Sequence, residues 1–254
     1  ADVRQAYLRY LEERYRYLEF KGMGISDRVP LQLPLVEMYV PLKARIELPE
    51  GETWARDLRV GGRPLGREGE ESLGRRLSDP QPVLDLLREY DCLVVLGDPG
   101  AGKTTFLKYL ALRLIAGQAE ALGLGSLLPV LVPVSAYATA LEAQDMRLDR
   151  FICEYYAEHC DSAPLDQMLR QALDGGLALI LLDGLDEVRD LALRQTVVQH
   201  VVDFYVAHHG AGNKFVLSSR IVGYRDVRPT APGLIECTLA DFEDQEIEQF
   251  VSLW

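Results

Sequence analysis

The chain has 254 residues, 48% of them hydrophobic and 26% charged, a balance typical of a domain that buries a core. Its formal net charge is −12, from 27 basic and 39 acidic residues, so we expect no broad binding to nucleic acid or to an anionic membrane. No apolar run approaches the roughly 18–20 residues that span a bilayer, and a signal-peptide pattern is lacking. The four cysteines form no C-x-x-C pair and no zinc motif, which indicates a reduced, cytoplasmic compartment.

Residues 1–49 predict a small N-terminal module of one helix and one strand. Over residues 3–19, apolar side chains recur three to four positions apart opposite a charged face, and Gly22 and Gly24 are placed to end that helix. Residues 35–40 lie between two prolines and predict a strand. We interpret the tyrosines near this end as packing groups rather than base-stacking groups: Tyr7, Tyr10, Tyr15 and Tyr17.

Apolar strands alternate with helical stretches over residues 82–240. The preceding residues, 50–81, are rich in glycine, proline and charge, so we expect a flexible linker or an exposed insertion there. Residues 82–90 predict a short helix. The expected strands lie near residues 92–96, 129–134, 177–182, 214–218 and 234–239. Because each strand is apolar throughout, we expect a parallel sheet covered by helices on both faces.

Residues 241–254 predict the truncated start of a further helical domain. Asp241 is a suitable N-cap, and Glu243 and Asp244 would lie in the first turn near the positive end of the helix dipole. The pattern is still helical at the last residue, and the first residue is not methionine. We therefore expect the sequence to be a piece of a longer protein.

A complete phosphate-binding loop follows the strand at residues 92–96. Its residues satisfy the pattern G-x-x-x-x-G-K-[ST] between a strand and a helix: Gly97, Asp98, Pro99, Gly100, Ala101, Gly102, Lys103 and Thr104. The glycines let backbone N–H groups surround phosphates, and Lys103 supplies a positive charge to the β- and γ-phosphates. The Thr104 hydroxyl would complete a Mg²⁺ shell, and Thr105 would reach the α-phosphate. The loop predicts a site for a nucleoside triphosphate with Mg²⁺.

Acidic residues end the strand at residues 177–182 and continue just beyond it. Asp183 is expected beside the phosphate loop, where a carboxylate holds Mg²⁺, usually through water. Asp186 and Glu187 follow, and either is a candidate for the base that orients the attacking water. The sequence leaves open which of the two it is.

Residues 183–187, Asp-Gly-Leu-Asp-Glu, resemble the Walker B signature of NACHT NTPases, members of the signal-transduction (STAND) branch of P-loop ATPases that includes the NOD-like receptors. Ordinary AAA+ proteins place Glu directly after the metal-binding Asp, where this chain has Gly184. Residues 218–220, Ser-Ser-Arg, are similar to the NACHT sensor 1 segment. The resemblance implies that their strand lies between the phosphate-loop strand and the Asp183 strand. Arg220 would then face the γ-phosphate, which suits its planar donor fork; the alternative is an arginine that only covers the sheet edge.

The resemblance covers nearly the whole chain and implies an ASCE P-loop NTPase fold, with a parallel five-stranded core sheet flanked by helices. It implies ATP or ADP and Mg²⁺ as ligands, slow ATP hydrolysis, self-association when ATP is bound, and effector and sensor domains outside this sequence. It points to the strand of Tyr39 and Val40 for adenine recognition. Many relatives carry a basic residue just after the second core strand, and residues 134–137 offer none.

The sequence is compatible with three functions. The leading hypothesis is an ATP-dependent oligomerisation switch in signalling or defence. A non-catalytic scaffold that uses nucleotide as a structural ligand is a second, and the acids Asp186 and Glu187 argue against it. An AAA+ loader or motor ATPase is a third, and Gly184 argues against it.

Overall fold

The computed structural model describes residues 3–18, 33–46, 79–160 and 165–253. A seven-stranded sheet in the order β2-β1-β7-β3-β6-β5-β4 forms its centre. The strands are β1 (Lys43–Ile46), β2 (Gln81–Pro82), β3 (Cys92–Leu96), β4 (Leu128–Pro133), β5 (Ala178–Asp183), β6 (Lys214–Ser219) and β7 (Leu234–Leu239). Five of them, β7-β3-β6-β5-β4, run parallel, while β1 pairs antiparallel with β7 and β2.

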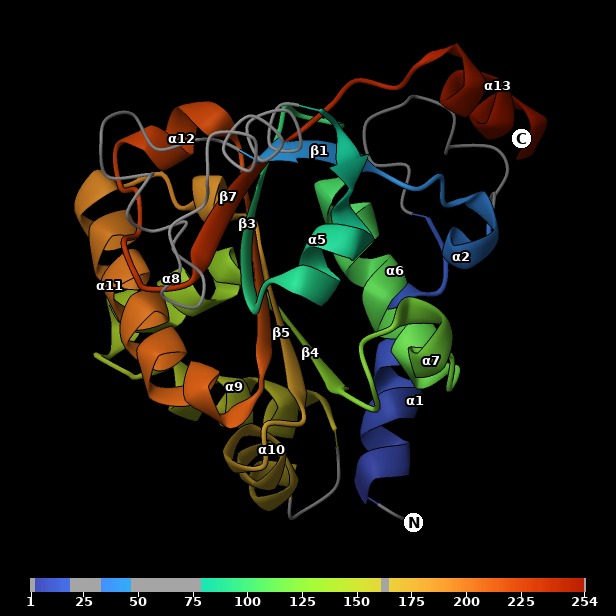
Figure 1. Ribbon diagram of the computed structural model, residues 1–254. Helices are drawn as coiled ribbons and strands as arrows, with labels where there is room; N and C mark the ends of the chain where they lie inside the picture. The colour runs from blue at the N-terminus through green and yellow to red at the C-terminus, as the bar shows by residue number, and fades with distance from the viewer. Residues whose placement is uncertain (1–2, 19–32, 47–78, 161–164, 254) are drawn as a thin grey trace, which may run out of the picture.

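Helices cover both faces of the sheet, with α8, α9 and α11 on one side and α5, α6 and α7 on the other (Figure 1). The helices before residue 145 are α1 (Val3–Tyr15), α2 (Leu35–Met38), α5 (Val83–Glu89), α6 (Lys103–Ile115), α7 (Ala119–Leu122) and α8 (Val134–Ala143). The later ones are α9 (Leu148–His159), α10 (Leu165–Asp174), α11 (Leu191–His208), α12 (Ile221–Arg225) and α13 (Asp244–Leu253), with short 3₁₀ turns η1 (Leu185–Glu187) and η2 (His209–Ala211). None of the helices in the described part of the chain is long and apolar enough to cross a membrane.

The predicted parallel core is confirmed, strand for strand. All five residues of β3 are buried, as expected for a central strand covered on both faces. β6 lies between β3 and β5, with Val95 beside Ser218 and Leu182 beside Leu217, which confirms the position inferred for the Ser-Ser-Arg strand. Because these strands are parallel, their carboxyl ends meet at one edge of the sheet, where α/β proteins bind ligands.

The strand predicted over residues 35–40 is wrong. Residues 35–38 form the single-turn helix α2, in which the Met38 N–H donates to the Pro34 carbonyl at 3.2 Å. Leu35 and Met38 are both buried, and a spacing of three places both on one side of a helical turn, which strand alternation would not do. The strand of this module is β1, which begins after the second proline and extends the core sheet.

The last helix begins two residues later than predicted. Asp241 is not its N-cap; α13 starts at Asp244, and the Glu243 N–H donates to Glu246 Oε2 at 2.6 Å. This is half of a capping box, in which a carboxylate inside the first turn bonds the backbone just before the helix. Lys43 of β1 lies 2.5 Å from Glu246 Oε1, so the carboxylate that caps the helix also bonds the sheet.

Tyrosines of α1 and α9 cover the exposed edge of β4. The Tyr7 hydroxyl donates to the Pro129 carbonyl at 2.7 Å, and the Tyr156 hydroxyl both accepts from Leu131 N–H at 3.2 Å and donates to its carbonyl at 2.5 Å. Tyr7 and Tyr15 are buried, which confirms the packing interpretation for these two. Bonding the backbone groups of an edge strand protects the sheet against pairing with another strand.

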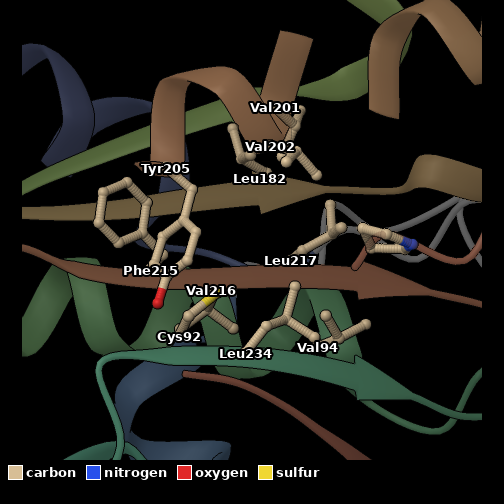
Figure 2. Close-up of a pocket in the computed structure, with 11 residues that line it drawn as sticks. Cys92, Val94, Leu182, Val201, Val202, Tyr205, Phe215, Val216, Leu217 and Leu234 are labelled. Carbon is tan, nitrogen blue, oxygen red and sulfur yellow. The ribbon is translucent and has the colours of Figure 1, made fainter. Parts of the chain in front are cut away.

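A small apolar cavity of ≈ 20 Å³ lies between α11 and the strands β3 and β6 (Figure 2). Its walls include Val94, Val202 and Leu217, and the one hydroxyl nearby, that of Tyr205, bonds the Pro232 carbonyl at 2.8 Å. A space of this size without polar partners stays dry. We interpret it as imperfect packing under α11 rather than as a ligand site.

The helix predicted over residues 3–19 ends earlier, at Tyr15, because the chain then pairs with the segment before α2. Tyr17 and Pro34 form an antiparallel bridge, and the Leu18 N–H donates to the Leu33 carbonyl at 2.9 Å.

The linker predicted over residues 50–81 ends in a strand, since Gln81 of β2 pairs with Ala44 of β1. Gly22 and Gly24, and the predicted linker as far as residue 78, lie outside the described residues.

Candidate nucleotide-binding site

The phosphate-binding loop joins β3 to α6 at the carboxyl edge of the sheet. Gly100 and Gly102 have φ of +81° and +87°, in the left-handed region that favours glycine. At Gly100 an added Cβ would meet no atom within 4 Å, so that position needs glycine for its backbone conformation alone. At Gly102 a Cβ would lie 3.4 Å from Leu42, which places the segment before β1 against the loop. Sequence reasoning missed Leu42, because nothing local links it to a loop so far along the chain.

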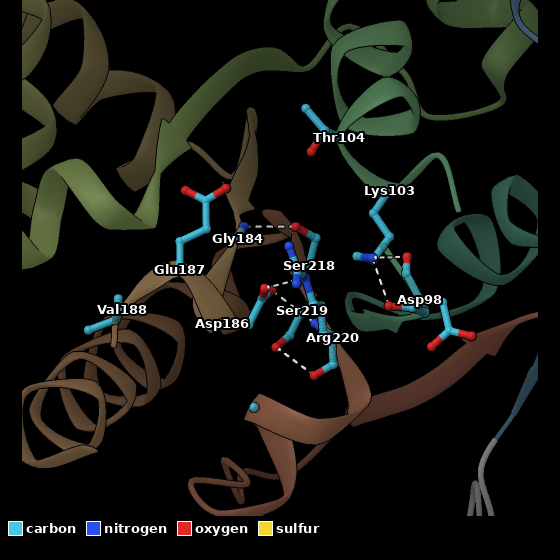
Figure 3. A network of polar contacts seen from close by, with 12 residues as sticks. Asp98, Lys103, Thr104, Gly184, Asp186, Glu187, Val188, Ser218, Ser219 and Arg220 are labelled. Carbon is cyan, nitrogen blue, oxygen red and sulfur yellow. Dashed lines mark hydrogen bonds and ion pairs between the residues drawn. The ribbon is translucent and has the colours of Figure 1, made fainter. Parts of the chain in front are cut away.

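Lys103 is the first residue of α6, and its ammonium folds back over the loop (Figure 3). Its Nζ donates to the carbonyls of Gly97 at 2.7 Å and Asp98 at 2.8 Å. Burial lowers the pKa of Lys103, with a smaller opposing effect from Asp186 and a lowering one from Arg220. Figure 3 shows the Lys103 side chain on the side of the site that faces Ser218 and Arg220. Both hydrogen bonds of the ammonium are to neutral carbonyls. An anionic phosphate would be a stronger hydrogen-bond partner than either of them.

Asp183 is held by two hydroxyl groups. Thr104 Oγ1 donates to Asp183 Oδ1 at 3.0 Å, and Ser218 Oγ donates to the same oxygen at 2.6 Å. The Ser218 oxygen also accepts from the Gly184 N–H at 2.9 Å, which ties β6 to the turn after β5 (Figure 3). Ser218 is buried, so these bonds fix the carboxylate beside the loop. The role of Ser218 in orienting Asp183 was not predicted from the sequence, because it depends on two strands, β5 and β6, that meet only in the folded sheet.

Thr104 and Asp183 fit a Mg²⁺ ion. A hydroxyl and a carboxylate are the hard oxygen donors that Mg²⁺ takes, and here they already lie within hydrogen-bond distance of each other. Within the described ranges no group of three or more His, Cys, Asp or Glu side chains could hold a metal by itself. Mg²⁺ usually keeps several waters in proteins and would take its other ligands from phosphate oxygens. When bound, Mg²⁺ would neutralise charge on those phosphates.

Asp186 and Arg220 form an ion pair beside the loop (Figure 3). Asp186 Oδ1 accepts from the Arg220 backbone N–H at 2.9 Å, and Oδ2 lies 2.9 Å from Arg220 Nε. The Asp186 side chain is 11% exposed and that of Arg220 54%, so the acid is enclosed while the guanidinium faces solvent. Both carboxylate oxygens of Asp186 are thus engaged by one residue.

Glu187 lies differently, although it is the next residue. Its Oε2 accepts from Ser135 Oγ at 3.0 Å. Its side chain crosses Gly184, where a Cβ would come within 2.9 Å of Glu187 Cδ, and Gly184 itself has φ of +80°. The small residue after Asp183 is therefore required both by the backbone and by the path of Glu187. Ser135 stands in the segment where many relatives carry a basic residue, and its role was not foreseen.

Tyr39 and Val40 pack inward against α6 and the core. The Tyr39 ring stacks on Tyr109 of α6, with ring centroids 3.8 Å apart, and its hydroxyl accepts from the Leu42 N–H at 3.3 Å. Burial raises the pKa of Tyr39, and Val40 is buried as well. The segment reaches the loop through Leu42.

This combination defines the class of protein: the strand order, the phosphate loop after β3, and an acid at the end of β5 bonded to the threonine of that loop make it a P-loop NTPase fold. The model of the NACHT domain family matches residues 91–254, more than half of the chain, so the chain belongs to the NACHT family of the STAND class. A comparison with curated proteins finds none that matches.

Proposed function

We propose that this chain is a nucleotide-dependent switch that binds ATP or ADP with Mg²⁺ and responds to the γ-phosphate. The observation that carries the proposal is the Arg220–Asp186 pair, which lies beside Lys103 with its guanidinium 54% exposed. A γ-phosphate would compete with Asp186 for the guanidinium, whereas ADP would leave the pair in place. A nucleotide can shift the protein between two conformations only if it binds one of them more tightly than the other, so ATP and ADP must differ in this preference.

The proposed roles follow the contacts. Gly97–Thr104 and Thr105 bind the phosphates, and Thr104 and Asp183 hold Mg²⁺. Of the two candidate bases, the contacts favour Glu187, because Asp186 has both oxygens engaged by Arg220 whereas Glu187 accepts one bond from a serine hydroxyl. Tyr39 and Val40 stay our proposal for the adenine side of the site, supported by the contact of Leu42 with the loop.

Hydrolysis would be slow. The slow rate is inferred from the resemblance to STAND ATPases. Glu187 accepts one bond from Ser135, and its carboxylate keeps acceptor sites with which it would orient water. We further propose that the ATP form self-associates and that effector and sensor domains elsewhere in the full protein carry the output. The boundaries proposed above, with the NACHT domain over 82–240, belong to this proposal, as does a role in cytoplasmic signalling or defence. Four free cysteines are consistent with that compartment.

Binding is tested with Lys103→Ala, which removes the charge that meets the phosphates. We expect ATP affinity to fall by at least about a hundredfold in calorimetry, the loss of a buried charged contact. Near-parent affinity would refute the site. Chromatography of nucleotide released on denaturation is the companion measurement: stoichiometric ADP supports a locked switch.

The sensing role is tested with Arg220→Ala. We expect its ADP affinity to stay near that of the parent while ATP loses its advantage. An equal large loss for both nucleotides would mean that Arg220 supports the fold rather than reads the γ-phosphate. Glu187→Gln should stop turnover with binding intact, and Asp186→Asn should change discrimination more than turnover; the reverse pattern would make Asp186 the base.

A nucleotide-stabilised scaffold without catalysis is the second candidate. It is favoured by the fact that both acids accept bonds within the protein. Nucleotide at a thousand times its dissociation constant would add about 4 kcal/mol of stability. A rise in melting temperature with ATP, without any phosphate release by the parent chain, would select this alternative.

A further inference from the structure

Arg194, in the first turns of α11, bonds the backbone on both sides of the Asp186–Arg220 pair. Its Nε donates to the Val188 carbonyl at 2.7 Å, just after the acidic turn η1. Its Nη1 donates to the Gly223 carbonyl at 3.0 Å, inside α12, the helix that follows Arg220. One side chain thus joins the segment that carries the acid to the segment that carries the arginine.

The two segments approach each other closely at this point. A Cβ added at Gly223 would lie 3.0 Å from the Asp186 Cβ and 3.4 Å from its Cα, so any larger residue would have to displace Asp186 by a few tenths of an ångström. The same Cβ would lie 3.5 Å from Arg194 Nη1. Gly223 therefore packs against both Asp186 and the guanidinium of Arg194. The geometry of the Asp186–Arg220 pair depends on the hydrogen bonds that keep these groups in place.

We propose that Arg194 is a positioning residue for the Asp186–Arg220 pair, an inference that rests on the proposed function of that pair. A guanidinium suits the task, because its planar fork offers donors in fixed directions to two carbonyls at once, whereas a lysine offers a single point of attachment. None of the hydrogen bonds described for Arg194 reaches the phosphate loop. Its loss should therefore alter discrimination between nucleotides and turnover more than the affinity for phosphate as such.

The chain contains a matched control in Arg88 of α5. Its Nε donates to the Leu122 carbonyl at 2.7 Å and its Nη2 to the Ala121 carbonyl at 3.3 Å, so it also joins two segments through backbone oxygens. It belongs to α5, which lies with α7 on the face of the sheet opposite α11 (Figure 1). Arg88→Ala removes a clamp between two backbone segments, together with an ion pair to Asp85, and reports what a loss of stability on the other face does to the site.

The experiment compares the parent with Arg194→Ala, Arg194→Lys and Arg88→Ala. Hydrogen exchange is followed in peptides over residues 184–190 and 219–225, where the Arg220 N–H donates to Asp186. Arg194→Ala should speed exchange in both peptides by about tenfold or more, as expected for a lost charged hydrogen bond, and Arg88→Ala should leave both unchanged. Arg194→Lys should lie between them.

Nucleotide measurements on the same four proteins complete the test. For Arg194→Ala we expect the ratio of ATP to ADP affinity to move toward one, and kcat to fall about tenfold with KM within about twofold of the parent. Equal behaviour of Arg194→Ala and Arg88→Ala in exchange and in these ratios would overturn the proposal. A parent that binds no nucleotide would refute the proposed function instead, and the exchange data would still decide whether Arg194 holds the pair.

Discussion

Replacement of Gly184 by alanine tests how the acidic turn is built. Gly184 has φ of +80°, so alanine there costs about 1–2 kcal/mol of backbone strain. The new Cβ would also lie 2.9 Å from Glu187 Cδ, closer than real contacts allow, so the carboxylate must move and lose its bond to Ser135. The total loss of stability should therefore exceed the backbone contribution alone.

Gly117 provides the matched control. Its φ is +72°, and an added Cβ there would meet no atom within 4 Å. Gly117→Ala should therefore cost only the backbone strain, about 1–2 kcal/mol in urea unfolding. The difference between the two variants isolates the displacement of Glu187.

Turnover supplies the functional readout. If Glu187 is the base, its displacement in Gly184→Ala should slow phosphate release by about a hundredfold, while Gly117→Ala keeps the parent rate. The double variant Gly184→Ala/Glu187→Ala should lose no more stability than the sum of Gly117→Ala and the single variant Glu187→Ala, because the crowding has gone while the bond to Ser135 is lost in both backgrounds. Equal stabilities for the two single variants, together with unchanged turnover in Gly184→Ala, would refute the role given to this glycine.

Three further predictions concern the buried polar groups. Ser218→Ala removes the donor to Asp183 and leaves a buried N–H without its acceptor, so the free energy of unfolding should fall by about 2–4 kcal/mol and stabilisation by Mg²⁺ with ATP should weaken, as thermal unfolding would show. Asn213 is fully buried, accepts from one backbone N–H and donates to two carbonyls; Asn213→Ala should cost a similar amount in urea unfolding while the nucleotide affinity of the folded protein stays unchanged. Burial raises the pKa of Tyr15 and of Tyr205 from 10.0 to about 12 and that of Cys92 from 9.0 to about 12, so the folded state keeps these protons longer; the stability that these groups contribute should begin to fall near pH 9 and fall more steeply from pH 10 to 12, as urea unfolding across that range would measure.

The sequence by itself determined the strand–loop–helix of the phosphate site, the apolar parallel strands and the acid at the end of β5. These features are local: the loop needs its glycines at φ near +80°, and buried strands need continuous apolar runs. The order of the strands also followed, through the resemblance of the Ser-Ser-Arg segment to a known family.

Only the tertiary structure decided which side chains meet. The helix at residues 35–38 forms because Leu35 and Met38 are both buried, a preference that flanking prolines do not reveal. At the start of α13 the capping Glu246 is also bonded to Lys43 of β1, about two hundred positions earlier in the chain. In both places the structure departs from the local pattern where the chain contacts a distant element.

The same reason governs the fine structure of the site. Ser135 lies 52 positions from Glu187, and Asp186 lies 34 positions from the arginine that engages it. Arg194 reaches the Gly223 carbonyl across 29 positions. These bonds form because parallel strands bring their carboxyl ends to one edge, and the sequence contains the residues without the distances between them. The motifs therefore predicted that the chain binds a nucleotide, while the partners of Asp186, Glu187 and Arg220 became known only from the folded sheet.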